Sequence, residues 1–221
     1  MLRLLLIGIG LFLVFTTCTK QSIEKPELYD AKAYFPLEDN AYWIYKRTDI
    51  TIDAAVDVND TLYSELKMKY IGYDDLLEHY RLERFTRADS LSPWEAFDVV
   101  LIEWDEVSMQ WVEDNYRYVK LTDPVYVDKS WDGNIYNILD EWDYYYSDLN
   151  RTFETNEVLF TSTIRVEKRN EDNAIGNTRA FEIFKKDVGP VYEYNADFSI
   201  QAGQIEKGNS TELILIKFGI E

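Results

Sequence analysis

Residues that could perform acid–base or nucleophilic chemistry are scarce in this chain, which has one histidine, His79, and one cysteine, Cys18. A hydrolase of the serine type needs a base beside its nucleophile, and no G-x-S-x-G elbow surrounds any serine. His79 lies beside Tyr80 in an alternating segment without a nucleophile motif, which indicates a structural or surface role. The spacings H-E-x-x-H and C-x-x-C of zinc centres are also absent from the sequence. The sequence therefore predicts no catalytic residue and no cofactor.

Carboxylates are abundant, with 41 Asp and Glu against 23 Lys and Arg, giving a formal charge of -18 among 221 residues. A glycoside hydrolase needs two carboxyl groups that face one cleft. Among so many acids, a close pair such as Glu141 and Asp143 indicates little. The charge also opposes nucleic-acid binding, because phosphate contacts need a surplus of Lys and Arg. We predict a protein that is not an enzyme and has no nucleic-acid partner, with glycoside hydrolysis as the catalytic alternative.

Asp128, Ser130 and Asp132, followed by Gly133, match the first half of an EF-hand calcium loop. Position 12 of such a loop is Leu139 here instead of a bidentate Glu, and strands rather than helices are expected on both sides. The pattern leaves two interpretations, a turn between strands, which we favour, and a weak calcium site. No other metal site is predicted.

The segment 142–146 is the most aromatic in the chain, with sequence WDYYY. Successive side chains of a strand point to opposite faces, so these rings cannot all enter one core. Either the strand is buried on both faces, as in a cross-strand aromatic ladder, or part of the cluster is exposed. Exposed Tyr and Trp beside carboxylates form binding surfaces for sugars and proteins. With both alternatives open, Trp142, Tyr144, Tyr145 and Tyr146 are the predicted ligand-binding residues.

The N-terminus has the pattern of an export signal. Residues 1–3 are a short basic start, and residues 4–15 are an apolar run of twelve. As a helix this run spans about 18 Å, well short of the ~30 Å hydrocarbon core, which favours a cleaved signal peptide. Residues 15–18 resemble the lipobox of bacterial lipoproteins, in which the cysteine is acylated and becomes the new N-terminus. The resemblance implies a signal peptide over 1–17 and a lipidation site at Cys18, whose acyl chains, such as palmitate, anchor the protein in a membrane. An ordinary export signal is the alternative.

The rest of the chain must position these candidates, and its pattern is that of strands. Residues 18–33 are polar and predict a lipidated tether. From residue 34 short segments alternate apolar and polar side chains, as at Ile50 and Ile52 or Leu66 and Met68. Such alternation is typical of antiparallel sheets with one wet face. We predict one all-β domain over 34–221, with roughly nine to eleven antiparallel strands in a strongly curved sheet or open barrel and at most one short helix.

Three places depart from simple alternation. Phe85 is out of phase with the residues before it, which predicts a β-bulge. Residues 135–149 fit helical and strand spacing, and we expect a short helical turn after Asn134 and then a strand from about Glu141. Residues 170–177 predict a turn-rich connection between strands.

Four segments of the chain form an ordered set of motifs: residues 34–37 (YFPL), 40–45 (NAYWIY), 131–134 (WDGN) and 187–194 (DVGPVYEY). Together they resemble a family of uncharacterised lipoproteins of Gram-negative bacteria, in which the first two segments open the mature domain and the others follow later. The resemblance covers most of the mature chain. It implies an exported lipoprotein of the outer membrane, facing the periplasm or the cell surface, with a mostly β domain and no established activity.

Two classes of function remain. The first is a cell-envelope binding or carrier lipoprotein that holds a glycan, peptide or lipid in a concave face lined by aromatic residues. The alternative is a structural or accessory lipoprotein that acts through contacts with an envelope protein, which predicts a filled interior and an exposed apolar patch. The aromatic content of 15% favours the first.

Overall fold

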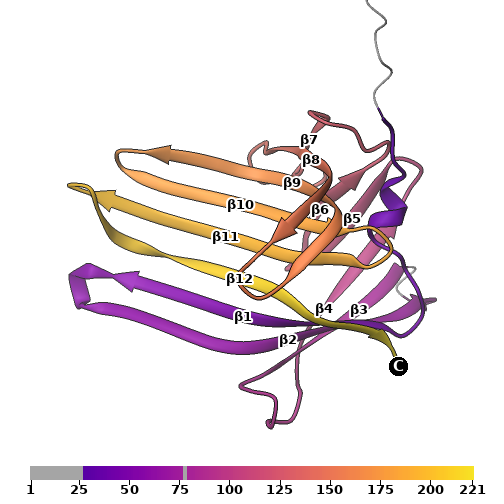
Figure 1. Cartoon of the computed structure of the whole chain (residues 1–221), viewed down its shortest axis with the longest axis horizontal. Helices are drawn as coiled ribbons and strands as arrows, with labels where there is room; N and C mark the ends of the chain where they lie inside the picture. The colour runs from indigo at the N-terminus through magenta and orange to yellow at the C-terminus, as the bar shows by residue number, and fades with distance from the viewer. Residues whose placement is uncertain (1–26, 77–78) are drawn as a thin grey trace, which may run out of the picture.

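The computed structural model describes residues 27–76 and 79–221, which form a single antiparallel sheet of twelve strands (Figure 1). The strands are β1 Ala41–Asp53, β2 Val58–Asp74, β3 His79–Arg87, β4 Glu95–Trp104, β5 Ser108–Glu113, β6 Tyr116–Thr122, β7 Ser130–Asp132, β8 Asp143–Glu154, β9 Leu159–Asn173, β10 Gly176–Lys185, β11 Gly189–Gln201 and β12 Gln204–Ile220. Their order in the sheet is β6-β5-β4-β3-β2-β1-β12-β11-β10-β9-β8-β7. Because β1 pairs with β12 and each strand otherwise pairs with its sequence neighbour, the sheet is a nearly closed barrel with one seam, between β6 and β7.

The predicted all-β antiparallel sheet, strongly curved or forming an open barrel, is confirmed. The bulge expected at Phe85 is also present, as a register shift between Arg84 and Phe85. Twelve strands exceed the predicted number, and the three-residue β7 has no sequence signal of its own. We predicted at most one short helix, and the structure has two single-turn 3₁₀ helices, η1 Ala31–Tyr34 and η2 Ala54–Val56. The turn expected within 170–177 is present but shorter than predicted, because β9 and β10 extend into this segment and leave only residues 174–175 as the turn.

The end of the barrel that we call the closed end carries η1 and the β2–β3, β4–β5, β6–β7 and β10–β11 connections. Phe35, which follows η1, is 1% exposed, stacks on Trp43 with ring centroids 5.6 Å apart and meets Trp111 edge-on. Tyr29 pairs with Val125, and Ala31 is fully buried. The folded part therefore starts by Tyr29, so the tether predicted over 18–33 extends too far into the domain. Cys18 and the signal peptide predicted over 1–17 lie outside the described residues.

Gly189 leaves room for the Trp43 indole to pack against the start of β11 at this end. Its φ is +109°, and a Cβ there would lie 3.0 Å from Nε1 of Trp43. The Trp43 indole donates a hydrogen bond to the Val188 carbonyl oxygen at 2.6 Å. These contacts fix the Trp43 indole at the base of the barrel interior.

The opposite end, here the open end, carries the β1–β2, β3–β4, β5–β6, β9–β10 and β11–β12 turns, and the long hairpin tips at the left of Figure 1 belong to it. Outside the barrel, the β8–β9 turn folds back over the sheet. Phe153 packs on Tyr192 with ring centroids 4.7 Å apart, and Glu157 pairs with Lys46 of β1. Several register shifts along β8 and β9 provide the bend.

The β6–β7 seam is joined by individual hydrogen bonds. Val119 N donates to the Gly133 carbonyl oxygen at 2.9 Å, and the Trp131 indole donates to the Val119 carbonyl oxygen at 2.9 Å. Both strands of the seam therefore have partners although no ladder connects them. Over residues 27–76 and 79–221, no helix has the length and hydropathy needed to cross a membrane.

Candidate functional site

The barrel interior contains a cavity of about 490 Å³ above the plug formed by η1 and Phe35. It is enclosed by side chains from β1–β5 on one side and β10–β12 on the other, with β6 contributing Lys120. A side pocket of about 380 Å³ adjoins it toward β8. The two spaces share Glu113, Asp114, Lys120, Glu193, Asn195 and Thr211. We call the two adjoining spaces together the groove, and each falls in the size range of small-molecule sites.

The floor of the cavity is apolar. Leu66 and Met68 of β2, whose alternation the sequence revealed, point into it, together with Met109 of β5. Tyr45 of β1 lies beside them, and its hydroxyl donates to the Pro190 carbonyl oxygen at 2.7 Å. Burial raises the pKa of Tyr45, so the phenol stays neutral at physiological pH. The floor therefore offers fixed hydrocarbon and aromatic surface.

An arginine cluster forms one wall. Arg84 of β3 donates from Nε to Asp98 of β4 at 2.5 Å and from Nη2 to Glu113 of β5 at 2.5 Å. The Trp111 indole donates to the other Glu113 oxygen at 2.9 Å. Burial opposes the negative charge of Glu113, but the Arg84 guanidinium outweighs it and lowers the pKa of this carboxyl. Glu113 is therefore held as a carboxylate.

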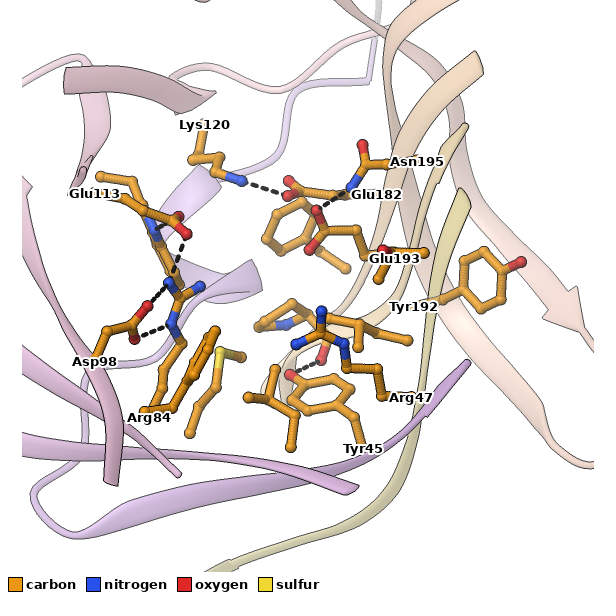
Figure 2. Close-up of a pocket in the computed structure, with 18 of the residues that line it drawn as sticks. Tyr45, Arg47, Arg84, Asp98, Glu113, Lys120, Glu182, Tyr192, Glu193 and Asn195 are labelled. Carbon is orange, nitrogen blue, oxygen red and sulfur yellow. Dashed lines mark hydrogen bonds and ion pairs between the residues drawn. The ribbon is translucent and has the colours of Figure 1, made fainter. Parts of the chain in front are cut away.

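A lysine cluster lies across the cavity from the arginine cluster (Figure 2). Lys120 of β6 and Lys168 of β9 both donate to Oε1 of Glu182 in β10, at 2.5 and 2.6 Å. Glu182 is 3% exposed, and burial opposes its charge, yet the two ammonium groups lower its pKa to about 2. The second oxygen, Oε2, is buried and has no hydrogen-bond partner among the described residues. Glu193 completes the cluster, accepting from Asn195 Nδ2 at 2.6 Å.

Charges around the groove are nearly balanced, in contrast to the whole chain. The lining contains five cationic and six acidic side chains: Arg47, Arg84, Lys120, Lys168, Arg169, Asp98, Glu113, Asp114, Glu182, Glu193 and Asp197. The formal charge of the chain is -18. The surplus of acids therefore lies elsewhere, and the groove has no strong preference for one sign of charge.

The structure separates the four predicted ligand-binding residues. Trp142 and Tyr144 line the side pocket. Tyr145 faces the other side of β8 and lines neither space. Tyr146 is fully buried, and its hydroxyl donates to the Thr122 carbonyl oxygen and accepts from Thr122 N, both at 2.8 Å. The prediction is wrong for Tyr146, because the same face of β8 continues past the groove into the packed closed end.

The candidate calcium residues lie in β7 and in the turn before it. Asp132 Oδ1 accepts hydrogen bonds from Asn134 N at 2.9 Å and Trp142 N at 3.0 Å, while Ser130 begins β7 and Asp128 has a φ of +63°. A Cβ on Gly133 would lie 2.5 Å from the Tyr144 ring, which explains the glycine in the WDGN segment. In the described part of the chain, no three His, Cys, Asp or Glu side chains gather closely enough to hold a metal ion.

Sequence reasoning missed the charged residues of the groove, above all Arg84, Lys120 and Glu182. Each lies in an alternating strand among other polar residues or as a single charge, so no local motif marks it. A weak signal exists for Glu182, which interrupts the apolar run 180–184 (AFEIF). A charge within a segment that is buried on both faces requires partners from other strands.

Known proteins supply no independent assignment for this site. No protein-family model, curated protein or solved structure matches the chain. The function of the groove is therefore argued from its own geometry.

Proposed function

We propose that the protein is a non-catalytic binding or carrier module of the cell envelope, which holds a small ligand in the cavity and its side pocket. The observation that carries this proposal is the cavity of about 490 Å³ inside the barrel. Its apolar floor and its pre-paired charged walls are the features of a preformed binding site, with a few fixed polar groups over hydrocarbon surface.

The state of the carboxyl groups favours binding over hydrolysis. A glycosidase needs a general acid whose pKa is raised so that it carries a proton at working pH. Two carboxyl groups of the groove have lowered pKa values instead, because Arg84 lowers the pKa of Glu113 and two lysines lower that of Glu182. Carboxylates held in this way accept hydrogen bonds but do not deliver protons.

The position of the N-terminus favours a water-soluble ligand. Residue 27, the first one described, leads into η1 at the closed end, and the groove extends toward the open end. An acyl anchor on Cys18 would tie the closed end to the membrane. The groove would then face the aqueous side of the envelope, where glycans and peptides are more accessible than bilayer lipid.

One observation favours the alternative, an accessory protein that acts through protein contacts. Leu62 and Tyr63 of β2 are 64% and 62% exposed, and Val56 at the neighbouring tip is also exposed. Leu62 and Tyr63 point to opposite faces of β2, so this hairpin presents apolar side chains on both faces to a partner. A partner bound there would leave the cavity without a role.

Calorimetric titration of the detergent-solubilised full-length protein with glycans, peptides and lipid vesicles tests the proposal. Thr211 lines both spaces, so Thr211→Trp is expected to fill their junction and weaken binding at least tenfold. Thr61→Trp is the matched control, because Thr61 is exposed on β2 outside the groove. Absence of binding in all three classes, or equal binding by both variants, would refute the proposal.

A further inference from the structure

We infer that the ligand is neutral and rich in hydroxyl groups, with at least two linked rings, and that one of its hydroxyls donates a hydrogen bond to Oε2 of Glu182. An oligosaccharide without charged groups has this chemistry. The inference rests on the proposed function and specifies its ligand.

The unpartnered oxygen of Glu182 is the first support. Glu182 lines the cavity and is 3% exposed, and both of its cationic partners bind the same oxygen, Oε1. No described residue donates to Oε2, which has almost no accessible surface, so the carboxyl group must turn slightly toward the cavity for a ligand to reach this oxygen. A buried acceptor without a donor is unfavourable, so a ligand that supplies a donor at this point gains affinity from it.

The charges around Glu182 select a neutral donor. An ammonium group on the ligand would meet Lys120 and Lys168, which already neutralise this carboxylate. An anionic ligand would meet Glu182 itself and Glu193, whose Oε1 lies 3.9 Å from Lys168. A hydroxyl donates to Oε2 without either repulsion. Ion pairs exposed to water would discriminate little between charged and neutral ligands. These side chains are largely buried, where charges interact more strongly.

The shape of the groove sets the length of the ligand. The cavity and the side pocket meet at Lys120 and Glu193, so a ligand can occupy both spaces. Each space has an aromatic ring near solvent, Phe97 at the cavity, which is 50% exposed, and the partly buried Trp142 at the side pocket. Sugar rings have apolar faces that pack on such side chains. Two spaces with one aromatic ring each fit two or more linked sugars.

Titration of the solubilised full-length protein with sugars that differ only in charge tests the ligand class. The neutral probes are cellobiose, maltose and N-acetylchitobiose, and the charged ones are glucosamine dimer and digalacturonic acid. At least one neutral disaccharide is expected to bind at least tenfold more tightly than either charged disaccharide, and more tightly than its own monosaccharide.

Glu182→Gln tests the acceptor. The two lysines require an oxygen at the Oε1 position, so the amide nitrogen must take the place of Oε2 and present a donor to the ligand. Binding of the neutral disaccharide is expected to weaken at least tenfold. Glu65→Gln is the matched control, because Glu65 pairs with Arg87 at 2.5 Å outside the groove. Thermal unfolding reports whether each variant is folded.

If Glu182→Gln does not fold, Trp142→Ala tests the inference in its place. Trp94→Ala is the control, because Trp94 packs on Arg87 away from the groove. Trp142→Ala is expected to weaken binding of the disaccharide and to leave binding of the monosaccharide unchanged. Unchanged disaccharide binding by Glu182→Gln, or by Trp142→Ala, would overturn the inference. The inference would also be overturned if the protein bound only charged sugars, peptides or vesicles. If Thr211→Trp blocked that binding, the proposed function would still stand. Absence of any binding would overturn both.

Discussion

Glu182 combines two properties that seldom occur together in one side chain, deep burial and a negative charge. Its charge is stabilised by Lys120 and Lys168, which come from strands far apart in sequence. Replacing such buried ion networks by hydrocarbon often leaves stability unchanged or raises it, so stability alone does not explain their presence. Their position in the cavity wall does, because they fix an acceptor and two donors where a ligand would meet them. At the residue scale, the groove is a set of polar groups oriented before any ligand arrives.

The pKa of Glu182 makes a prediction for stability. Its folded value of about 2 lies below the ordinary value of 4.5, so its ionisation stabilises the fold fully above about pH 4.5, and this stabilisation is lost as the pH falls toward 2. Glu182→Ala removes the carboxylate that both buried lysines bind and should destabilise the protein by about 3–5 kcal/mol at pH 7. The difference between the two proteins should shrink toward pH 2. Urea denaturation at a series of pH values measures it.

Glu206→Ala serves as the control, since Glu206 is exposed near the open end of β12, and it should change stability by less than about 0.5 kcal/mol. A destabilisation of Glu182→Ala that stays constant from pH 7 to pH 2 would show that the charge of Glu182 does not stabilise the fold.

At the scale of the elements, the alternation of apolar and polar residues predicted the strands that have one buried face. It did not predict strand segments that have no buried face. Leu66 and Met68 point into the barrel, and their polar neighbours point outward, so period two is visible in the sequence. Residues 170–173 are exposed on both faces, and only their hydrogen bonds to β10 make them a strand. The pairing of β7 is likewise set by its neighbour β8, not by its three residues. Backbone pairing beyond the core leaves no hydrophobic pattern to detect.

The β6–β7 seam yields a prediction for Tyr146. Its hydroxyl bonds both backbone groups of Thr122, and Tyr146→Phe would leave these two buried groups without partners. We expect a loss of about 1–3 kcal/mol in the free energy of unfolding and faster hydrogen exchange at the Thr122 amide. Tyr145→Phe, on the opposite face of the same strand, should change stability by less than about 0.5 kcal/mol. Equal stability of the two variants would mean that Tyr146 does not stabilise the seam.

At the scale of the whole molecule, the groove depends on how the sheet closes, which local patterns do not encode. Alternation shows that one face of each strand is inward, but not that β1 pairs with β12 or that Arg84 faces Glu182 across open space. Whether an interior is filled depends on the summed volumes of side chains from distant strands. Trp142 and Tyr144 were within reach of sequence reasoning because aromatic clustering is local. The balance of charge in the groove was not, since it is a property of the assembled barrel.

The arrangement of the two barrel ends gives the last prediction, which concerns Cys18. If this residue is acylated, the anchor joins the chain at the closed end, and the groove extends toward the opposite end. Cys18→Ala should therefore move the protein from the membrane to the soluble fraction while leaving the dissociation constant for its ligand within twofold. Thr19→Ala keeps the cysteine and should stay in the membrane fraction. Fractionation and calorimetry measure the two effects separately. Persistence of Cys18→Ala in the membrane would exclude the anchor, whereas release with weakened binding would place the N-terminal segment at the groove instead of behind it.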